Sequence, residues 1–331
     1  MQKELSDILS RFSSVNVLCV GDIMIDRFVY GKVERISPEA PVPVFQYVKE
    51  KKMLGGSGNV VANLRALGCK TFFAGMVGQD SFGQDVADLL KQLDCDFYLL
   101  KTANRPTIMK ARFIAGNNHI LRFDREEIIP LSDEEEHDLL AHLALQIEKA
   151  DIVLLSDYAK GLLSKSVVAE IIKMCHAAGR KVLIDPKGAD YSKYAGAFLV
   201  KPNRKELEQA AGVSLDPLSD DFLSKVAGAA RSLLRQHHIQ NMIVTLSEKG
   251  MLYVPSDPNE KEIYLSTYAR EVFDVSGAGD TSLSALGAAL AAAASVRQAM
   301  ELANTASGLV VAKLGTATVT NAELMQEIKQ K

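Results

Sequence analysis

The segment Asp274-Val-Ser-Gly-Ala-Gly-Asp280 combines glycines, a carboxylate and the start of an apolar helix in a spacing that could support catalysis. Gly277 and Gly279 let the backbone approach a ligand, and the helix predicted behind them directs free N–H groups toward it, which makes an anion site. Asp280 would stay ionised in that first turn and could accept a hydroxyl proton while the amides hold a transferring phosphoryl group. The same residues could equally form a tight turn in which Asp280 only caps the helix.

Three other segments could contribute to the same chemistry. Gly55-Gly-Ser-Gly58-Asn59 precedes a predicted helix, although no Walker-type lysine follows it. Asn203 and Glu206 follow a predicted strand and share one face of a helix start, where they could hold a water-coated Mg²⁺ or form a capping box with Asn203 as N-cap. The segment 245–250 is predicted to break from a strand into a turn, which suits contact with a nucleotide.

The elements that must position these residues follow from hydrophobic periodicity. Val15–Val20 is typical of a buried strand that ends at Gly21-Asp22. Three prolines and a strand-like pattern exclude a long helix between residues 27 and 52, and alternation on both sides of Gly116-Asn-Asn118 indicates a hairpin. We therefore expect residues 27–53 and 96–125 to form a small β-sheet lid outside the core.

Helical and strand patterns alternate along the rest of the chain. Predicted helices cover 59–67, 82–93, 133–149 and 164–178, and predicted strands cover 70–77, 152–156, 181–185, 197–200 and 241–246. Strands that alternate with helices of this length predict a mostly parallel sheet covered on both faces. No linker or repeat divides the sequence, so we expect residues 1–331 to form one α/β domain.

Composition excludes several classes of function. The 38 basic and 41 acidic residues give a net charge of −3, with no electrostatic footprint for nucleic acid or a membrane. Neither a signal-peptide core nor a membrane-spanning apolar segment is evident, so a cytoplasmic location is expected. The widely spaced cysteines are expected to be buried thiols in a reducing compartment: Cys19, Cys69, Cys95 and Cys175.

In this order and spacing, the segments resemble the ribokinase/PfkB family of carbohydrate kinases over essentially the whole chain. Gly55-Gly56 is similar to the N-terminal signature, and residues 274–280 with the Ala-rich helix are similar to the C-terminal one. Asn203 and Glu206 match the metal motif, and residues 21–26 match the end of the first strand. The resemblance implies a ribokinase-like three-layer α/β core with a β lid, and ATP and Mg²⁺ as cofactors. It does not decide whether a monovalent cation is needed near the anion hole.

The family's functional residues map onto this sequence by position. The resemblance implies that Asp280 is the catalytic base and that the amides of Gly277, Ala278 and Gly279 form the anion hole. It implies that Asp26, Gly55, Gly56 and Asn59 hold the sugar, and we add Asp22, Lys187 and Arg112 as further candidate substrate residues. The residues implied for the nucleotide are Asn203, Glu206, Ser247, Glu248, Gly250 and Asn304, with Asn203 and Glu206 also holding the metal through water.

A finer resemblance narrows the substrate. Arg35–Val44 is similar to the lid segment of the D-glycero-β-D-manno-heptose 7-phosphate kinases. Residues 185–188 and 313–316 also resemble segments of these kinases. This resemblance implies phosphorylation of the anomeric hydroxyl to the 1,7-bisphosphate, in ADP-heptose synthesis for the lipopolysaccharide core. Residues 116–119 are less basic than expected for such kinases. The cations that could meet the distal phosphate, each of which could instead be a solvated charge, are Lys187, Arg112, Arg122 and Lys110.

Alternatives remain at this point. Another PfkB-type substrate, such as ribose, a fructose phosphate or a nucleoside, keeps the same fold and mechanism. A non-catalytic sensing module is disfavoured by the complete set of Asp280, Asn203 and Glu206. Tyr158 and Lys160 follow a strand and either border the cleft or serve only their loop. Relatives often pair through the lid, so a homodimer is expected. The chain stops at Lys331, so we expect no C-terminal nucleotidyltransferase domain.

Overall fold

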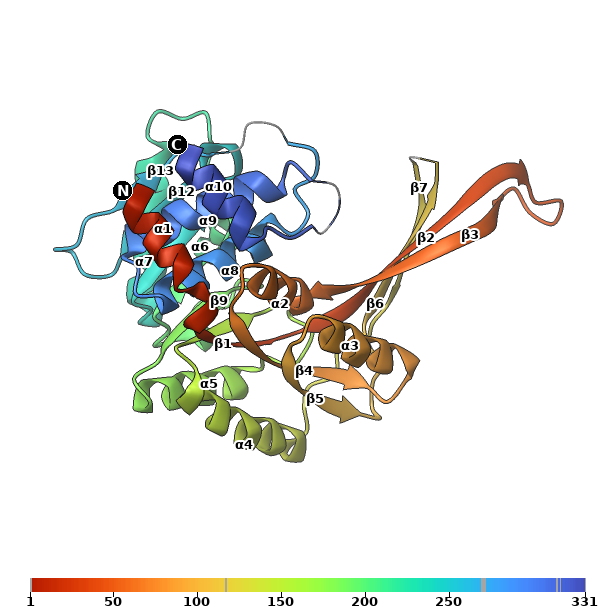
Figure 1. The fold of residues 1–331 in the computed structure, drawn as a ribbon, viewed down its shortest axis with the longest axis horizontal. Helices are drawn as coiled ribbons and strands as arrows, with labels where there is room; N and C mark the ends of the chain where they lie inside the picture. Colours follow the sequence, from red (N-terminus) through yellow and green to blue (C-terminus); the bar gives the residue numbers. More distant parts are fainter. Residues whose placement is uncertain (1, 117, 269–271, 314, 316, 331) are drawn as a thin grey trace.

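Two β-sheets organise the molecule, which the computed structural model describes for residues 2–116, 118–268, 272–313, 315 and 317–330 (Figure 1). The larger sheet has nine strands in the order β13-β12-β11-β10-β9-β8-β1-β4-β5, and the smaller has four in the order β3-β2-β6-β7. The strands of the larger sheet are β1 (Asn16–Gly21), β4 (Lys70–Gly78), β5 (Asp96–Thr102), β8 (Ile152–Ser156), β9 (Lys181–Asp185), β10 (Leu199–Val200), β11 (Asn241–Thr245), β12 (Met251–Pro255) and β13 (Ile263–Leu265). Those of the smaller sheet are β2 (Ile23–Ile36), β3 (Pro43–Gly56), β6 (Met109–Ala115) and β7 (Asn118–Arg125).

The larger sheet is parallel from β5 to β11, and β12 and β13 add an antiparallel edge, which confirms the predicted mostly parallel sheet. Its central strands are buried on both faces, as in β1, where Val17 and Cys19 face one core and Leu18 and Val20 face the other. The helices of the first core are α1 (Gln2–Ser10), α2 (Ser57–Ala66), α3 (Ser81–Gln92), α8 (Ala278–Ala291), α9 (Val296–Val310) and α10 (Asn321–Gln330). Those of the second are α4 (Asp133–Lys149), α5 (Lys165–Ala177), α6 (Arg204–Ala211) and α7 (Phe222–His237).

The smaller sheet forms the lid, and its β2–β3 ribbon projects as an arm from the body (Figure 1). Gly31 lies at a register shift in this ribbon, where a Cβ would come within 2.4 Å of the Gln46 carbonyl oxygen. The hairpin predicted near residues 116–118 is confirmed by the antiparallel pairing of β6 and β7, although Asn117 itself lies outside the described residues.

The predicted extent of the lid is wrong at one place. Residues 96–102 were expected in the lid, but they form β5, which pairs in parallel with β4 at the edge of the larger sheet. The alternating pattern in this segment is that of a half-covered edge strand, which hydrophobic periodicity alone does not distinguish from a strand of a separate sheet. The second lid segment therefore begins at β6.

Two expectations from composition can be compared with the structure. The cysteines are free and buried, as predicted. Within the described part of the chain, no helix has both the length and the apolar character needed to cross a bilayer.

Candidate active site

Asp280 lies in the first turn of α8, at the side of the larger sheet where the carboxyl ends of the parallel strands lie. Gly277 caps the helix with φ of 81°, a left-handed conformation that favours glycine. The Asp280 carboxylate is buried, with the residue 7 % exposed, and both of its oxygens accept hydrogen bonds. Asn59 Nδ2 donates to Oδ2 at 2.7 Å, and the Tyr158 hydroxyl donates to Oδ1 at 2.8 Å. These two donors from separate elements fix the orientation of the carboxylate.

The ionisation of Asp280 is set by opposing effects. Burial raises the pKa of this carboxyl above its ordinary value, and the hydrogen bonds from Asn59 and Tyr158 partly oppose the shift because they favour the charged form. The positive charge of Lys201 also lowers the pKa, whereas the negative charge of Asp26 raises it. A buried carboxylate with a raised pKa is a stronger proton acceptor than an exposed one, which suits a general base.

Asp274 fixes the turn before Asp280, because its carboxylate contacts both the turn itself and the segment around Gly315. Its Oδ1 accepts the Ser276 N–H at 2.8 Å and its Oδ2 accepts the Gly315 N–H at 3.0 Å, and the Ser276 hydrogen bond is the main reason that the pKa of Asp274 is low. The anion hole proposed for Gly277, Ala278 and Gly279 stays a prediction. The Ala278 N–H donates to the Val275 carbonyl at 3.3 Å, a contact that a bound anion would have to replace.

An ion pair between a buried lysine and a half-buried aspartate, which the sequence did not reveal, lies against this turn. Lys201 follows β10, is only 2 % exposed, and places Nζ 3.1 Å from Asp185 Oδ1 at the end of β9. A Cβ on Gly279 would lie 3.9 Å from Asp185 Oδ2 and 4.0 Å from Lys201 Nζ. Burial raises the pKa of Asp185 to about 7 although Lys201 opposes it. Asp185 is the last residue of its parallel strand and Lys201 the first residue after its own. Ligand sites of open α/β sheets form at these strand ends, and this position is the signal that could have found both residues.

The di-glycine segment joins the lid to α2 and explains the spacing seen in the sequence. A Cβ on Gly55 would lie 2.5 Å from Asp26 Oδ2, so only glycine lets the Asp26 carboxylate keep its position. Gly56 has φ of 59° and ends β3, and Asn59 follows in the first turn of α2 with its amide on Asp280. The predicted substrate residues Asp26, Gly55 and Asn59 therefore lie together with the predicted base.

Replacing Gly55 by Ala is expected to raise KM for the sugar by roughly tenfold or more, because overpacking costs about 1–3 kcal/mol and here it displaces Asp26. The KM for ATP should change little. Steady-state kinetics of both substrates measure the difference. The matched control is Gly228→Ala in α7, where no heavy atom lies within 4 Å of the added Cβ. Equal sugar KM values for wild type and Gly55→Ala would contradict the assigned role of Asp26.

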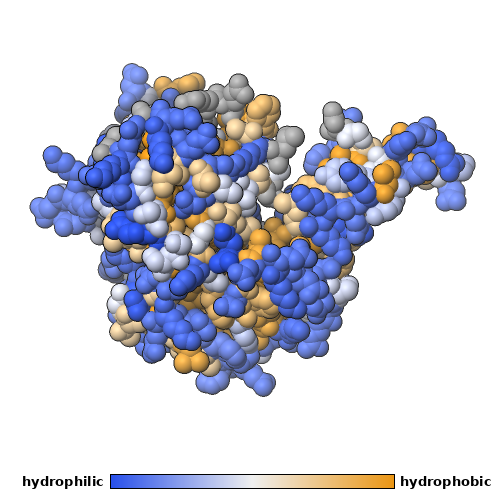
Figure 2. All heavy atoms as spheres, viewed as in Figure 1, coloured by the Kyte–Doolittle hydropathy of each residue, from blue (hydrophilic) through white to orange (hydrophobic). Residues whose placement is uncertain are grey.

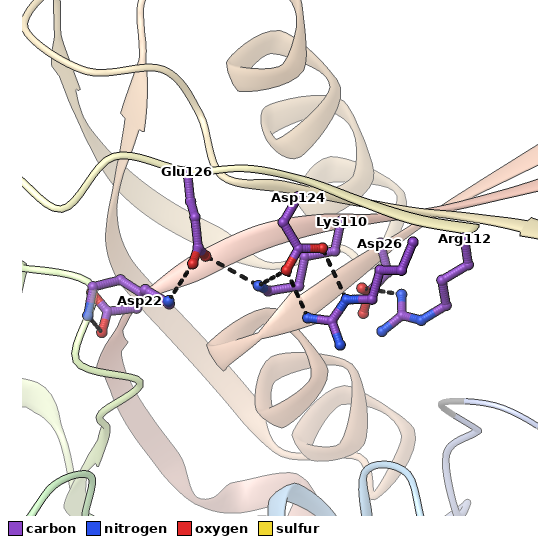
Figure 3. Close-up of polar contacts among 8 residues, drawn as sticks. Asp22, Asp26, Lys110, Arg112, Asp124 and Glu126 are labelled. Carbon is purple, nitrogen blue, oxygen red and sulfur yellow. Dashed lines mark hydrogen bonds and ion pairs between the residues drawn. The ribbon is translucent and has the colours of Figure 1, made fainter.

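The face of the lid that carries Asp26 is lined with charged side chains from three strands (Figure 3). Asp26 pairs with Lys110 on β6, which in turn pairs with Asp124 on β7, and residues paired in this way share a face. Arg112 Nη1 lies 2.5 Å from Asp26 Oδ1, and Lys110 Nζ lies 3.1 Å from Asp124 Oδ2 and 3.0 Å from Glu126 Oε2. The cations suggested for a distal phosphate are thus engaged with carboxylates, as is Arg122 with Asp124.

Asp22 and Lys187, both predicted to bind substrate, make other contacts in the structure. The Asp22 carboxylate is buried and accepts three backbone N–H groups of the loop after β8. Lys187 Nζ lies 2.9 Å from Glu206 Oε1, on the side of the predicted nucleotide residues and not beside Arg112. Their substrate roles stay predictions, and the described contacts favour a positioning role for Asp22.

The predicted nucleotide residues lie beyond β10 and β11. Asn203 and Glu206 form the capping box that the sequence offered as an alternative: Asn203 Oδ1 accepts the Glu206 N–H and Glu206 Oε2 accepts the Asn203 N–H, each at 3.0 Å. Gly250, with φ of 93°, packs against the Leu265 carbonyl, and Asn304 Nδ2 donates to the Ser266 carbonyl at 2.7 Å. Gly250 and Asn304 thus meet at the end of β13, and Ser247 and Glu248 occupy the short turn before Gly250.

Solved structures with this architecture define the class. The fold is similar to a ribokinase of Arabidopsis thaliana complexed with ribose and ATP (TM-score 0.72, 20 % identity, 95 % of this chain and 99 % of that one). It is also similar to phosphofructokinase-2 of Escherichia coli in complex with potassium (TM-score 0.76, 18 % identity, 96 % and 98 %). These likenesses establish a ribokinase-like fold. The pfkB family carbohydrate kinase pattern matches residues 15–323, so the chain belongs to this family and is a carbohydrate kinase.

Curated relatives are considerably more similar in sequence. The "Bifunctional protein HldE" of Mesorhizobium japonicum is 45 % identical over 96 % of this chain, and that of Paramagnetospirillum magneticum is 45 % identical over 97 %. The matched region covers 62 % and 65 % of those two proteins, so the chain spans less than two thirds of the length of these relatives.

Proposed function

We propose that this chain transfers the γ-phosphoryl group of ATP to the anomeric hydroxyl of D-glycero-β-D-manno-heptose 7-phosphate, in ADP-heptose synthesis. The observation that carries the chemistry is the buried Asp280 carboxylate, oriented by Asn59 and Tyr158 at the N-terminus of α8. The heptose assignment is supported by the lid segment 35–44 and by the 45 % identity to proteins named HldE. We expect the reaction to take place in the cytoplasm, where ATP is supplied.

The proposed step balances without a further reactant. The sugar hydroxyl oxygen bonds to the γ-phosphorus, the bond from that phosphorus to the β–γ bridging oxygen breaks, and ADP leaves. The hydroxyl proton passes to the Asp280 carboxylate. The amides of Gly277, Ala278 and Gly279 would face the charge on the transferring group, because helix N-termini favour anions. Closure of the lid over the sugar would exclude water and so limit hydrolysis of ATP.

Magnesium fits the donor set near α6 when it is held through water. The described residues contain no group of three or more His, Cys, Asp and Glu side chains that could hold a metal ion. Glu206 Oε1 and Oε2 each accept one hydrogen bond and retain a lone pair, and Mg²⁺ keeps several waters beside one or two carboxylates and phosphates. Asn203 and Glu206 would thus hold the ion, which neutralises charge between the β and γ phosphates when bound. A monovalent cation near the anion hole is a further part of this proposal.

The distal phosphate of the sugar would bind on the charged face of the lid. Arg112, Lys110 and Arg122 lie on this face, and each is paired with a carboxylate. A phosphate could exchange with these carboxylates, since Arg and Lys form strong hydrogen bonds with either anion. We therefore expect the 7-phosphate to be required for efficient turnover.

A panel of sugars tests this proposal against the runner-up, another PfkB-type substrate. ADP release is measured with heptose 7-phosphate, unphosphorylated heptose, fructose 6-phosphate and ribose, each with Mg²⁺ and ATP. Heptose 7-phosphate is expected to give the highest kcat/KM by at least roughly a hundredfold. Faster turnover of ribose or fructose 6-phosphate would refute the heptose assignment and leave the kinase chemistry intact.

We further propose that two chains pair through their lids. Large apolar side chains are exposed there, and Figure 2 shows hydrophobic atoms among the hydrophilic ones on the arm. They are Ile36, Val42, Tyr47, Val48, Ile120, Leu121 and Phe123. Pairing would cover this surface and the lid's open strand edges. Sedimentation of the purified chain measures its mass directly, and a mass of 36.0 kDa at micromolar concentration would contradict pairing.

A further inference from the structure

Tyr158 comes from the loop after β8 and contacts the Asp280 carboxylate, and in the proposed reaction it neither binds the substrate nor takes the proton. Its hydroxyl donates to Asp280 Oδ1 at 2.8 Å, while Asn59 Nδ2 occupies Oδ2 at 2.7 Å. Each carboxylate oxygen accepts two hydrogen bonds, so one site on each remains for the sugar hydroxyl. The tyrosine therefore does not block the base, and it restricts how the carboxylate can turn.

The loop that carries Tyr158 is held rigidly by a second carboxylate. Asp22 Oδ2 accepts the N–H groups of Tyr158 and Lys160, both at 3.0 Å, and Asp22 Oδ1 accepts the Leu162 N–H at 3.2 Å. Ala159, between the first two, has φ of 54°, which costs energy for a residue with a Cβ. Ala159 thus adopts a strained conformation directly beside Tyr158, in a loop that the buried Asp22 carboxylate holds, which indicates that the position of Tyr158 matters.

We infer that Tyr158 is a positioning residue for the base, whose hydroxyl orients the Asp280 carboxylate and keeps it in the ionised form that accepts the sugar proton. This inference rests on the proposed role of Asp280. It assigns to Asp22 the task of holding the loop, and it connects Tyr158 to the lid, because Lys160 Nζ lies 2.9 Å from Glu126 Oε1 after β7.

The electrostatic surroundings of Asp280 agree with this inference. Charged or titratable groups face Asp280 from four other segments, and they are Asp26 of β2, Cys19 of β1, Asp185 at the end of β9 and Lys201 directly after β10. Burial and Asp26 favour the protonated acid, whereas Asn59, Tyr158 and Lys201 favour the anion. Burial also raises the pKa of Tyr158 well above its ordinary value, so the phenol keeps its proton and remains a donor. Loss of the hydroxyl should therefore raise the pKa of Asp280.

Tyr158→Phe tests the inference through the pH dependence of kcat/KM for the sugar. The acidic limb, which reports the base, is expected to move to higher pH by about one unit, and kcat near neutral pH should fall roughly ten- to a hundredfold. The KM for ATP should stay within about twofold. Tyr253→Phe is the matched control. Tyr253 lies on β12, and its hydroxyl contacts Glu260 Oε1 at 2.9 Å and Asn241 Oδ1 at 2.7 Å, not Asp280.

The outcomes separate a positioning role from a structural one. The inference is supported if the acidic limb shifts in Tyr158→Phe and does not shift in Tyr253→Phe. An unshifted limb overturns it, whether the rate is unchanged or falls in proportion to thermal stability as in Tyr253→Phe. A second readout does not need turnover: the pKa of Asp280 is followed by ¹³C NMR in aspartate-labelled protein, with Asp280→Asn to assign the signal. A higher value in Tyr158→Phe supports the inference even if the proposed substrate is wrong, and an equal value overturns it.

Discussion

Replacing Asp280 by Asn is expected to lower kcat by several orders of magnitude and to leave ATP binding within about twofold of wild type. An amide cannot take the proton of the sugar hydroxyl, yet it can accept from Asn59 and donate to the Tyr158 oxygen, so the geometry of the site should persist. Turnover is measured by ADP release, and ATP affinity by titration calorimetry. The melting temperature should not fall, because burial already disfavours the charge of this carboxyl.

The control for this substitution is Asp216→Asn, which removes an exposed carboxylate that accepts a backbone N–H from Leu218. It should leave both turnover and ATP affinity unchanged. If Asp280→Asn retained more than about a tenth of wild-type kcat, Asp280 would be only a helix-capping residue and the base would have to be sought elsewhere.

Replacing Lys201 by Met is the second change with a large expected effect. It leaves Asp185, whose side chain is 21 % exposed, without its partner; breaking a fully buried ion pair from one side costs about 3–5 kcal/mol of stability, so the cost here should be at or below the lower end of that range. It also removes a positive charge that favours the anionic form of Asp280, so kcat should fall together with stability. Urea unfolding and ADP release measure the two effects separately.

The loss of stability should depend on pH in a predictable direction. Asp185 has a folded-state pKa of about 7, above its ordinary value, so its contribution to stability declines as pH rises toward 7. Without Lys201 the pKa rises further, and the decline extends to higher pH. The difference from wild type should therefore be larger at pH 8.5 than at pH 6, and a difference that shrinks with rising pH would contradict this account.

The double substitution Lys201→Met with Asp185→Asn separates the two roles of the lysine. Neutralising the partner should recover most of the stability, because no unpaired buried charge remains. It should not recover kcat, since the positive charge near Asp280 is still missing. Full recovery of activity in the double variant would show that Lys201 acts only through Asp185.

The parts of the site that the sequence predicted are those with a local physical signature. Gly277 and Asp280 can be recognised because a glycine turn before an apolar helix has a defined geometry. Gly55 is required by close approach of Asp26, and glycine pairs signal such approaches without any knowledge of the partner. The strands after residue 132 were predicted because their apolar runs alternate with helical periods.

The parts that the sequence did not predict depend on contacts between distant segments. Lys201 and Asp185 end different strands, and nothing in their local sequence says that β9 and β10 are neighbours. The same holds for Tyr158, for which the sequence left open a place at the cleft or a role in its loop alone, and for Asp22, whose partners lie 136 or more residues away. The Asn203 and Glu206 pair shows a further limit, because a capping box and a water-mediated metal site use the same residue types.

The most direct measurement of the central proposal is ³¹P NMR of the purified chain incubated with Mg²⁺, ATP and D-glycero-β-D-manno-heptose 7-phosphate, with Asp280→Asn in a parallel tube. The account predicts a new anomeric phosphate signal coupled to the sugar H1, formed in equal amount with ADP in the wild-type tube and absent from the other. Release of ADP with inorganic phosphate alone, or the same sugar product in both tubes, would contradict it.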